Sequence, residues 1–270
     1  MGDRLRDKTA IIVGGGQTPG ETIGNGRATA IRFAQEGARV LLVDIDETLG
    51  KETLDIIEKD VGRAFKGGSV LAADITKEAD CARIAKTCVD RYGRIDILHN
   101  NVGRSRGDNP THLMDADMWD EIMAMNLKGM FMTCKHVLPV MRAQKSGAII
   151  NISSVSSFAG GQTVTYRTSK GAVNTLTQHI AIENAKHGVR CNAILPGLMD
   201  TPMAIERRVK ERNVTREVVR SERDAAVPLL GKMGTGWDVA NAALFLASEE
   251  AKFVTGVLLP VDGGALVNRG

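Results

Sequence analysis

Two residues four positions apart carry side chains that could together move a proton. Tyr166 and Lys170 belong to the segment Tyr-Arg-Thr-Ser-Lys, which opens a long stretch of helical periodicity. At this spacing both side chains lie on one face of a helix, so the ammonium group can lie beside the phenol. A neighbouring positive charge lowers the pKa of a phenol from its usual value of about 10. The pair therefore predicts a tyrosine that exchanges a proton with a substrate near neutral pH.

A serine at the end of an apolar run adds a hydrogen-bond donor to this pair. Ser154 ends the Asn-Ile-Ser-Ser segment at 151–154. Its hydroxyl can bind a carbonyl oxygen and stabilise the negative charge that develops there as a hydride moves. A tyrosine and a lysine at helical spacing are also common in purely structural roles, so this hypothesis depends on the motifs around them.

A glycine-rich loop follows the first apolar run and precedes an alanine-rich helical stretch. It begins at Gly14 and ends in Gly24, Asn25 and Gly26. Glycines let the backbone approach a pyrophosphate, whose charge then lies at the positive end of the following helix. A strand-to-helix turn that binds nothing also uses glycine, and the absence of Gly-Lys-Ser/Thr argues against a P-loop. We assign these four residues to a dinucleotide-binding loop.

An acidic residue at the end of the second apolar run bears on which dinucleotide binds. Asp44 follows Leu-Leu-Val at 41–43, and Ile45 comes next. A carboxylate here can accept hydrogen bonds from the adenosine ribose and would repel a 2′-phosphate, and no adjacent cation is offered to such a phosphate. A solvent-facing acid at a strand end is the alternative. The pattern favours NAD over NADP.

The elements that must position these residues are short apolar runs alternating with helical stretches. Continuous apolar runs are typical of parallel strands that helices cover on both faces. Gly37, Gly93 and Gly188 each stand where a helix would end before a strand. The pattern predicts an α/β fold, a doubly wound seven-stranded parallel sheet in a single domain over residues 1–270. The strands are expected at 10–13, 40–43, 70–73, 95–98, 148–152, 191–195 and 257–261.

Composition excludes several other classes of protein. The 270 residues carry 35 basic and 32 acidic side chains, a net charge of +3 without a basic block, so no nucleic-acid partner is expected. No apolar run is long enough for a membrane span and no signal segment is apparent, which predicts a cytoplasmic protein without a membrane partner. The four cysteines and five histidines lack metal-ligand spacing, so we expect free thiols and no metal.

Two further features follow the glycine loop and Asp44 along the chain: an Asn-Asn-Val-Gly motif at 100–103 and Asn126. The chain resembles the classical short-chain dehydrogenase/reductase family nearly end to end. The resemblance implies a Rossmann fold and a proton relay of Asn126, Ser154, Tyr166 and Lys170, in which Asn126 bends its helix and holds a water. It implies a cofactor site made of Gly14, Gly24, Asn25, Gly26, Asp44, Asp74, Ile75, Asn101, Gly103, Tyr166, Lys170, Pro196, Gly197 and Thr201.

Three features depart from the family pattern. Val13 stands where a threonine usually precedes the first glycine, so one contact within the loop is lost. Six more residues than usual separate Gly14 from Gly24, which leaves the phosphate donors open. Ser154 stands twelve residues before Tyr166, whereas the usual spacing of thirteen falls on Ser153. We assign the role to Ser154, because the strand motif aligns on it.

The stretch at about 198–226 is expected to form a lid over the substrate. It contains Arg207, Arg208 and five further basic residues mixed with acids. One hypothesis is that an arginine here recognises a carboxylate or phosphate of the substrate. The interleaved acids favour the other interpretation, solvated helix faces from 206 to 224 that form an insertion over the sheet.

The pattern as a whole predicts an NAD-dependent oxidoreductase. Its substrate would be a secondary alcohol or ketone, with Tyr166 as the general acid and base. An NADPH-dependent 3-oxoacyl thioester reductase is a second possibility, and a non-catalytic dinucleotide-binding protein is a third. Because the family usually pairs the helix after Lys170 between subunits, a homotetramer or homodimer is expected by resemblance.

Overall fold

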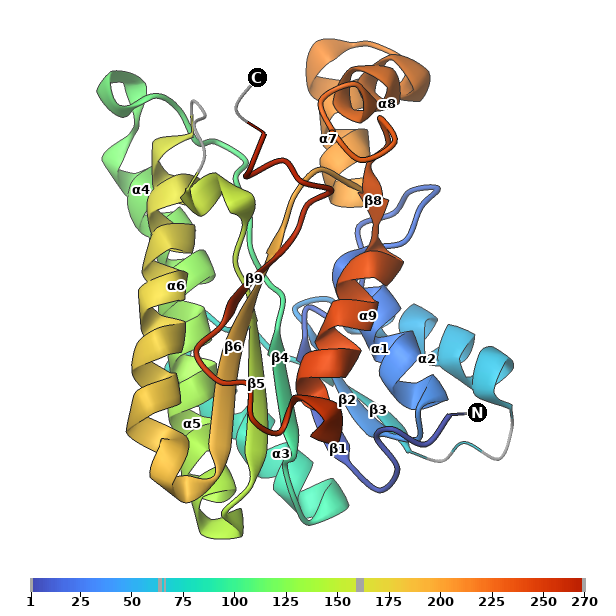
Figure 1. Cartoon of the computed structure of the whole chain (residues 1–270), viewed down its shortest axis with the longest axis vertical. Helices are drawn as coiled ribbons and strands as arrows, with labels where there is room; N and C mark the ends of the chain where they lie inside the picture. The colour runs from blue at the N-terminus through green and yellow to red at the C-terminus, as the bar shows by residue number, and fades with distance from the viewer. Residues whose placement is uncertain (1, 63–64, 66, 159–162, 269–270) are drawn as a thin grey trace.

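Seven parallel strands form the central sheet of the computed structural model, which describes residues 2–62, 65, 67–158 and 163–268 (Figure 1). Their order across the sheet is β3-β2-β1-β4-β5-β6-β9, and every neighbouring pair is parallel. The predicted doubly wound α/β fold is therefore confirmed. The strands are β1 (Thr9–Val13), β2 (Arg39–Asp44), β3 (Gly68–Ala72), β4 (Ile97–Asn100), β5 (Gly147–Ile152), β6 (Val189–Pro196) and β9 (Leu258–Val261).

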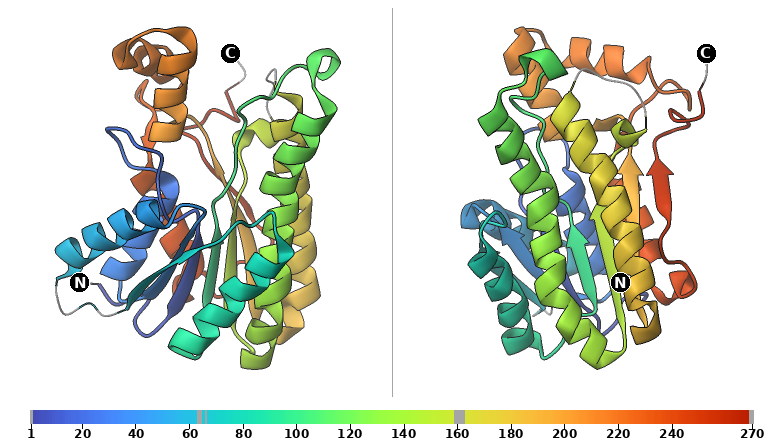
Figure 2. Two further views of the ribbon diagram at one scale, coloured as in Figure 1. Left: turned by 180° about the vertical axis from the view of Figure 1, so that it is seen from behind. Right: turned by 90° about the vertical axis from the view of Figure 1, so that its left-hand side faces the viewer.

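Helices cover both faces of this sheet, as the apolar strands require. Figures 1 and 2 show α1, α2 and α9 on one face, and α3, α5 and α6 on the other, with α4 beyond α5. These helices are α1 (Asn25–Gln35), α2 (Glu47–Val61), α3 (Glu78–Tyr92), α4 (Ala116–Met123), α5 (Gly129–Gln144), α6 (Val164–Asn184) and α9 (Gly236–Ala247). Single turns are η1 (Thr111–Leu113), η3 (Val155–Ser157), η4 (Ala185–His187) and η5 (Glu249–Ala251).

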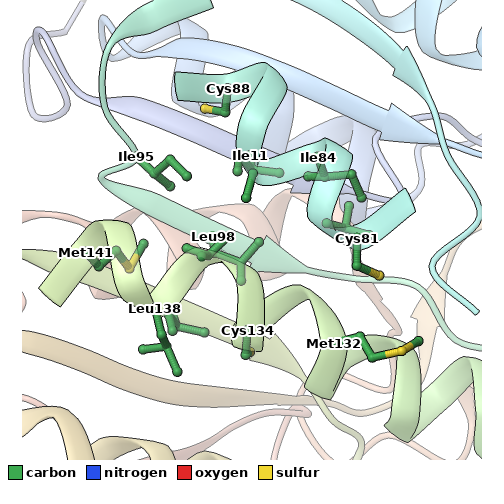
Figure 3. Packing of buried hydrophobic residues seen from close by; sticks show 14 of the residues in the cluster. Ile11, Cys81, Ile84, Cys88, Ile95, Leu98, Met132, Cys134, Leu138 and Met141 are labelled. Carbon is green, nitrogen blue, oxygen red and sulfur yellow. The ribbon is translucent and has the colours of Figure 1, made fainter. Parts of the chain in front are cut away.

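Two apolar cores, one on each face, hold the helices against the sheet. Figure 3 shows part of the first, in which side chains of α3 and α5 pack on Ile11 and Leu98. The second core joins α1 and α9 to the other face of β1, with Ile12 and Phe33 fully buried. Because both faces of β1 are buried, its apolar residues run without interruption, and this is the signal that predicts it.

The structure differs from the sequence expectation in two places. The fourth strand is Ile97–Asn100 rather than 95–98, because the polar Asn100 is satisfied inside the protein by the Oδ1 atom of Asn151 at 3.0 Å. A second, two-stranded parallel sheet, β7 (Met199–Asp200) with β8 (Gly234–Thr235), was not expected. Gly37, Gly93 and Gly188 all have positive φ, which confirms the three predicted helix ends.

Two helices stand beyond the carboxyl ends of the strands. They are α7 (Pro202–Arg212) and α8 (Arg216–Asp224), and Figure 2 shows them apart from the layers that cover the sheet. This arrangement agrees with an insertion over the sheet. Among the residues that the structure describes, no helix is both long and apolar enough to cross a membrane.

Candidate active site

A cavity of about 1190 Å³ opens at the carboxyl ends of the strands. Its walls come mainly from the loops after β1 to β6, from Tyr166 and Lys170 of α6, and from α7 and Arg223 of α8. The chain turns in opposite directions from β1 and β4, and parallel α/β sheets bind ligands at such a switch point. All the predicted site residues line this cavity except Asn126, which lies next to the lining residue Met125.

The glycine loop brings backbone from three segments close together. Gly14 has φ of 79°, and a Cβ atom on Gly26 would lie 1.9 Å from the carbonyl oxygen of Gly14. Asn101 donates a hydrogen bond from Nδ2 to that same oxygen at 3.3 Å. Only glycine at position 26 permits this packing, which fixes the first turn of α1 against the loop.

The N-terminus of α1 is open toward the cavity. Gly24 is its N-cap residue, and no side chain caps the first turn. The Oδ1 atom of Asn25 is buried there without a hydrogen-bond partner. Unpaired N–H groups at the positive end of a helix are suited to a phosphate group. These donors and the closely packed glycines fit the pyrophosphate of a dinucleotide.

The six extra residues of this loop are folded rather than splayed. Gln17 closes them, because its Nε2 donates to Thr22 O at 3.0 Å and its Oε1 accepts from Gly24 N at 2.7 Å. Glu21 forms ion pairs with Arg220 at 3.2 Å and Arg216 at 3.5 Å, both on α8. Sequence reasoning missed Gln17 and Glu21, because their partners are not marked by any local spacing.

Two carboxylates, Asp44 at the end of β2 and Asp74 after β3, line the cavity. Asp44 accepts hydrogen bonds from Gly16 N at 3.0 Å and Asp46 N at 3.3 Å. Asp74 accepts from the hydroxyl and the N–H of Thr76, and the hydroxyl bond is the main cause that lowers the Asp74 pKa. Asp74 is therefore ionised at neutral pH. Ile75 beside it is buried.

Lys170 is held in one place by burial and by a single strong hydrogen bond. Its Nζ donates to Ile152 O at 2.6 Å and lies 5.8 Å from the centre of the Tyr166 ring. A Cβ atom on Gly103 would lie 3.0 Å from Nζ, so glycine leaves room for the ammonium group. Burial lowers the pKa of Lys170 to about 8, because the charged form loses its hydration.

The predicted effect on Tyr166 is wrong in direction. Burial raises the pKa of Tyr166, and this outweighs a hydrogen bond with Ser154 and the charges of Arg207 and Arg208, which lower it. The expectation rested on Lys170, which is not among the groups that shift the pKa of Tyr166. The structure thus brings the predicted pair together, but the two arginines supply the positive field at the phenol.

The two neighbouring serines have different partners. Ser153 is buried and donates from Oγ to Lys170 O at 3.0 Å, which fixes the strand end against α6. Ser154 lines the cavity, as Ser153 does, and its Oγ lies 2.5 Å from the Oγ of Ser156. Ser154 also acts on Tyr166, where it opposes the effect of burial on the pKa. Of the two serines, only Ser154 acts on the pKa of Tyr166, while the hydroxyl of Ser153 is occupied by Lys170 O.

Asn126 lies in an irregular helical turn between α4 and α5. The turn, η2 (Ala124–Lys128), is π-helical, so the helix is distorted at the expected place. Asn126 Oδ1 accepts from Arg104 N at 2.8 Å, and its Nδ2 donates to Arg104 O at 2.9 Å and to Ser169 Oγ at 3.1 Å. The side chain therefore ties the segment after β4 to α6.

The end of β6 turns into the α7 region through a close backbone contact. Gly197 N donates to Val261 O at 2.9 Å, and a Cβ atom on Gly197 would lie 2.6 Å from the Cβ of Asp262. Pro196 and Gly197 line the cavity, and Thr201 is buried as the N-cap residue of α7.

The comparisons with known proteins agree with this geometry. A family described as Enoyl-(Acyl carrier protein) reductase matches residues 21–265. The chain belongs to the classical short-chain dehydrogenase/reductase family. A levodione reductase of Leifsonia aquatica is 34% identical over 264 residues, which cover 97% of this chain and 95% of that protein. A 3-oxoacyl-[acyl-carrier-protein] reductase of Thermotoga maritima is 36% identical over 268 residues, 98% of this chain and 100% of the relative.

Solved structures give the same family. A short-chain dehydrogenase/reductase from Burkholderia xenovorans superposes with a TM-score of 0.92 at 38% identity, covering 99% of this chain and 100% of that one. The relatives include both dehydrogenases and reductases, so this chain is an oxidoreductase. Members of this family bind a nicotinamide dinucleotide.

One positioning residue of this short-chain dehydrogenase/reductase was missed by sequence reasoning. The carboxylate of Asp108 accepts hydrogen bonds from Thr165 N at 3.1 Å and Tyr166 N at 2.6 Å. It therefore caps the first turn of α6, the turn that carries Tyr166. Asp108 is far from α6 in the sequence and follows no capping pattern there, so no local signal could have revealed it.

No cluster of three metal-ligating side chains occurs within the described residues. The four cysteines are buried free thiols, and burial raises the pKa of each one. They lie away from the cavity lining and belong to the packing of the first core.

Proposed function

We propose that this protein transfers a hydride between NAD(H) and a secondary alcohol or ketone. The observation that carries the proposal is the meeting of Tyr166, Lys170 and Ser154 in one cavity with the glycine loop. A binding module has no need for a buried lysine held beside a tyrosine and a serine.

The proposed roles follow from the contacts. In alcohol oxidation the phenolate of Tyr166 accepts the hydroxyl proton while the hydride leaves the carbon, and Ser154 binds the oxygen on which charge changes. Lys170 would hold the nicotinamide ribose and would pass the proton on toward Asn126 through a water. When bound, the nicotinamide ring accepts or donates the hydride and in its oxidised form adds a positive charge.

The proposed cofactor site runs along the loops after the first four strands. Gly14, Gly24, Asn25 and Gly26 would hold the pyrophosphate. The remaining assigned residues would hold the adenosine and nicotinamide halves: Asp44, Asp74, Ile75, Asn101, Gly103, Pro196, Gly197 and Thr201. NAD is favoured because Asp44 is presented at the end of β2 and the next residue, Ile45, is exposed and apolar.

A second candidate is the NADPH-dependent reduction of a 3-oxoacyl thioester, which a relative's name supports. It requires a cation near Asp44 for the 2′-phosphate. A non-catalytic dinucleotide-binding role is the third candidate, and it requires no turnover at all. We also propose a cytoplasmic homotetramer or homodimer of single-domain chains, with residues 198–226 as a substrate lid.

The test is NADH production at alkaline pH from a panel of secondary alcohols and hydroxy acids, with NAD and NADP in parallel. Tyr166→Phe should reduce kcat by at least about 100-fold, because it removes the proton-transfer group. Binding of NAD by this variant, measured by titration calorimetry, should remain. Preference for NADP would contradict the use of Asp44, and NAD binding without turnover of any substrate would favour the non-catalytic role.

A further inference from the structure

Positively charged side chains gather on one wall of the cavity, the α7–α8 segment, residues 202–224. Arg207, Arg208, Lys210 and Arg223 line the cavity. Two carboxylates of the same wall, Glu206 and Glu211, are paired with Arg216 and Arg207. Arg207 donates to the Oγ of Ser105 at 2.9 Å, and Ser105 also lines the cavity, in the segment after β4. This contact joins α7 to that segment.

The other three arginines of this segment form ion pairs with acidic residues, as the interleaved acids predict. They lie outside the cavity lining, and each has a carboxylate partner on the protein. These pairs are Arg212 with Glu222 at 2.6 Å, Arg216 with Glu206 at 2.9 Å and Arg220 with Asp200 at 3.1 Å. For these three, the interpretation as solvated helix faces agrees with the structure.

Arg208 and Arg223 are different. Arg208 donates only to Ala204 O, at 2.7 Å. Arg223 donates to Met199 O at 3.3 Å and to the sulfur of Met233. Within the described part of the chain, neither guanidinium forms an ion pair with a carboxylate, although Asp200 and Glu211 act on them from farther away.

Two partly buried, like-charged groups without close counter-ions are costly to keep. Burial, followed by the charges of Arg208 and Arg207, lowers the pKa of Arg223 to about 10. Burial and the charge of Arg207 also lower the pKa of Arg208. An anion between them would offset this repulsion, and the forked guanidinium suits an oxyanion that accepts two hydrogen bonds.

This charge acts on the reacting centre. The charges of Arg207 and Arg208 oppose the rise that burial causes in the Tyr166 pKa, and both arginines line the same cavity as the phenol. We propose that the substrate is an anionic secondary alcohol or ketone whose carboxylate, sulfonate or phosphate is bound by Arg208 and Arg223. The inference rests on the proposed hydride transfer and specifies its substrate class.

The phosphates of the cofactor have a separate site. The pyrophosphate would bind at the open N-terminus of α1, beside Gly24 and the unpaired Oδ1 of Asn25. The glycine loop does contact this segment, but through the ion pairs of Glu21 with Arg216 and Arg220, which lie outside the cavity lining. Arg207 instead bonds Ser105 after β4, and the charges of Arg207 and Arg208 act on Tyr166. We therefore assign the anion to the substrate rather than to the cofactor.

The first experiment compares hydroxy acids of increasing length with their neutral primary amides. For the wild-type protein, kcat/KM should be at least about tenfold higher for the best acid than for its amide. Arg208→Gln and Arg223→Gln should each raise KM for that acid by about 10- to 100-fold, the range of a hydrogen bond to a charged group. Their KM for the amide should change by less than about threefold.

Arg212→Gln is the matched control, because Arg212 lies one turn after Arg208 on α7 and pairs with Glu222 outside the cavity. It should leave KM for acid and amide unchanged. Equal KM values for acid and amide in the wild-type protein would overturn the inference and leave the proposed function standing. A raised KM for NAD alone in Arg208→Gln would also overturn it, because the arginine would then bind the cofactor.

A second measurement does not depend on turnover. Thermal unfolding is followed with sodium malonate, methanesulfonate or phosphate at constant ionic strength, with sodium chloride as reference. At least one oxyanion should raise the Tm of the wild-type protein and of Arg212→Gln, but not that of the Arg208→Gln/Arg223→Gln double variant. Identical shifts in all proteins would overturn the anion site. Arginine-dependent shifts without hydride transfer from any alcohol would support the site and contradict the proposed function.

Discussion

At the scale of single residues, the proton affinity of Tyr166 depends on Ser154 and not on Ser153. The hydrogen bond from Ser154 lowers the pKa of Tyr166 against the larger effect of burial, whereas the hydroxyl of Ser153 is occupied by Lys170 O. Ser154→Ala should therefore raise the pKa of Tyr166. The ascending limb of kcat/KM against pH for alcohol oxidation should move to higher pH, with a loss in kcat of roughly 100-fold.

Ser153→Ala provides the matched comparison. It removes a neighbouring hydroxyl without removing a partner of Tyr166, so the midpoint of the pH profile should stay at the wild-type value. A midpoint that moves in Ser153→Ala and stays in Ser154→Ala would contradict the assignment. The sequence alone could not decide between Ser153 and Ser154, because the usual spacing to Tyr166 and the strand motif indicate different residues. The Oγ contacts of each serine distinguish them.

At the scale of elements, α6 begins under the control of a distant carboxylate. Asp108 accepts from two N–H groups of the first turn, and one belongs to Tyr166. Asp108→Ala should lower the free energy of unfolding by about 1–2 kcal/mol, as the loss of a helix cap does. It should also lower kcat, because the turn that carries Tyr166 loses its anchor. Chemical denaturation and steady-state kinetics measure the two effects.

Asp115 serves as the control, because it caps α4 by accepting from Met118 N and does not line the cavity. Asp115→Ala should cost a similar free energy of unfolding without a comparable fall in kcat. Asp108→Asn retains one acceptor oxygen and should recover part of the lost activity. Equal losses of kcat in Asp108→Ala and Asp115→Ala would show that Asp108 acts only through stability.

The strands could be predicted where burial on both faces makes their residues uniformly apolar. β1, β2 and β6 are apolar because helices cover both faces, and their positions agree with the expectation to within two residues at the start and one at the end. β4 was misplaced because its last residue is a buried asparagine, paired with Asn151. The pairing of β7 with β8 could not be predicted, because strands of two residues show no repeating sequence pattern.

At the scale of the whole molecule, the sheet contains a histidine that stays neutral in the folded protein near neutral pH. His99 in β4 is fully buried, neither ring nitrogen has a hydrogen-bond partner in the described structure, and burial lowers its pKa to about 3. The unfolded chain binds a proton at about pH 6.5. Between these values only the unfolded state gains the proton, so stability falls as the pH falls below about 6.5.

This contribution should amount to about 2 kcal/mol between pH 7 and pH 5, since one pKa unit corresponds to about 1.4 kcal/mol. In His99→Leu, the decrease in the free energy of unfolding over this interval should be smaller by that amount. Replacing the exposed His112 by Gln should leave the decrease unchanged. Urea denaturation at both pH values measures the difference, and an unchanged decrease in His99→Leu would contradict the prediction.

How far the candidate site was predictable depends on how its residues are linked. The loops at the ends of parallel strands meet at one edge, so Asp44, Asn101 and Ser154 could be placed together from the strand pattern. The partners of the lid arginines could not, because Arg208 and Arg212 look alike in the sequence and differ only in which carboxylates the fold brings near them.

The expanded glycine loop joins the two halves of the molecule that would hold the two reactants. Glu21 reaches Arg216 and Arg220 on α8, while Gln17 of the same loop bonds Gly24 at the start of α1. Dissociation of a dinucleotide from beneath this loop would then require the partly exposed ion pairs to open, so its residence time should shorten as ionic strength rises. In Glu21→Gln the release rate, followed by stopped-flow fluorescence, should be faster and nearly independent of salt. The rate at which this protein exchanges its cofactor would then depend on the ionic strength of its surroundings.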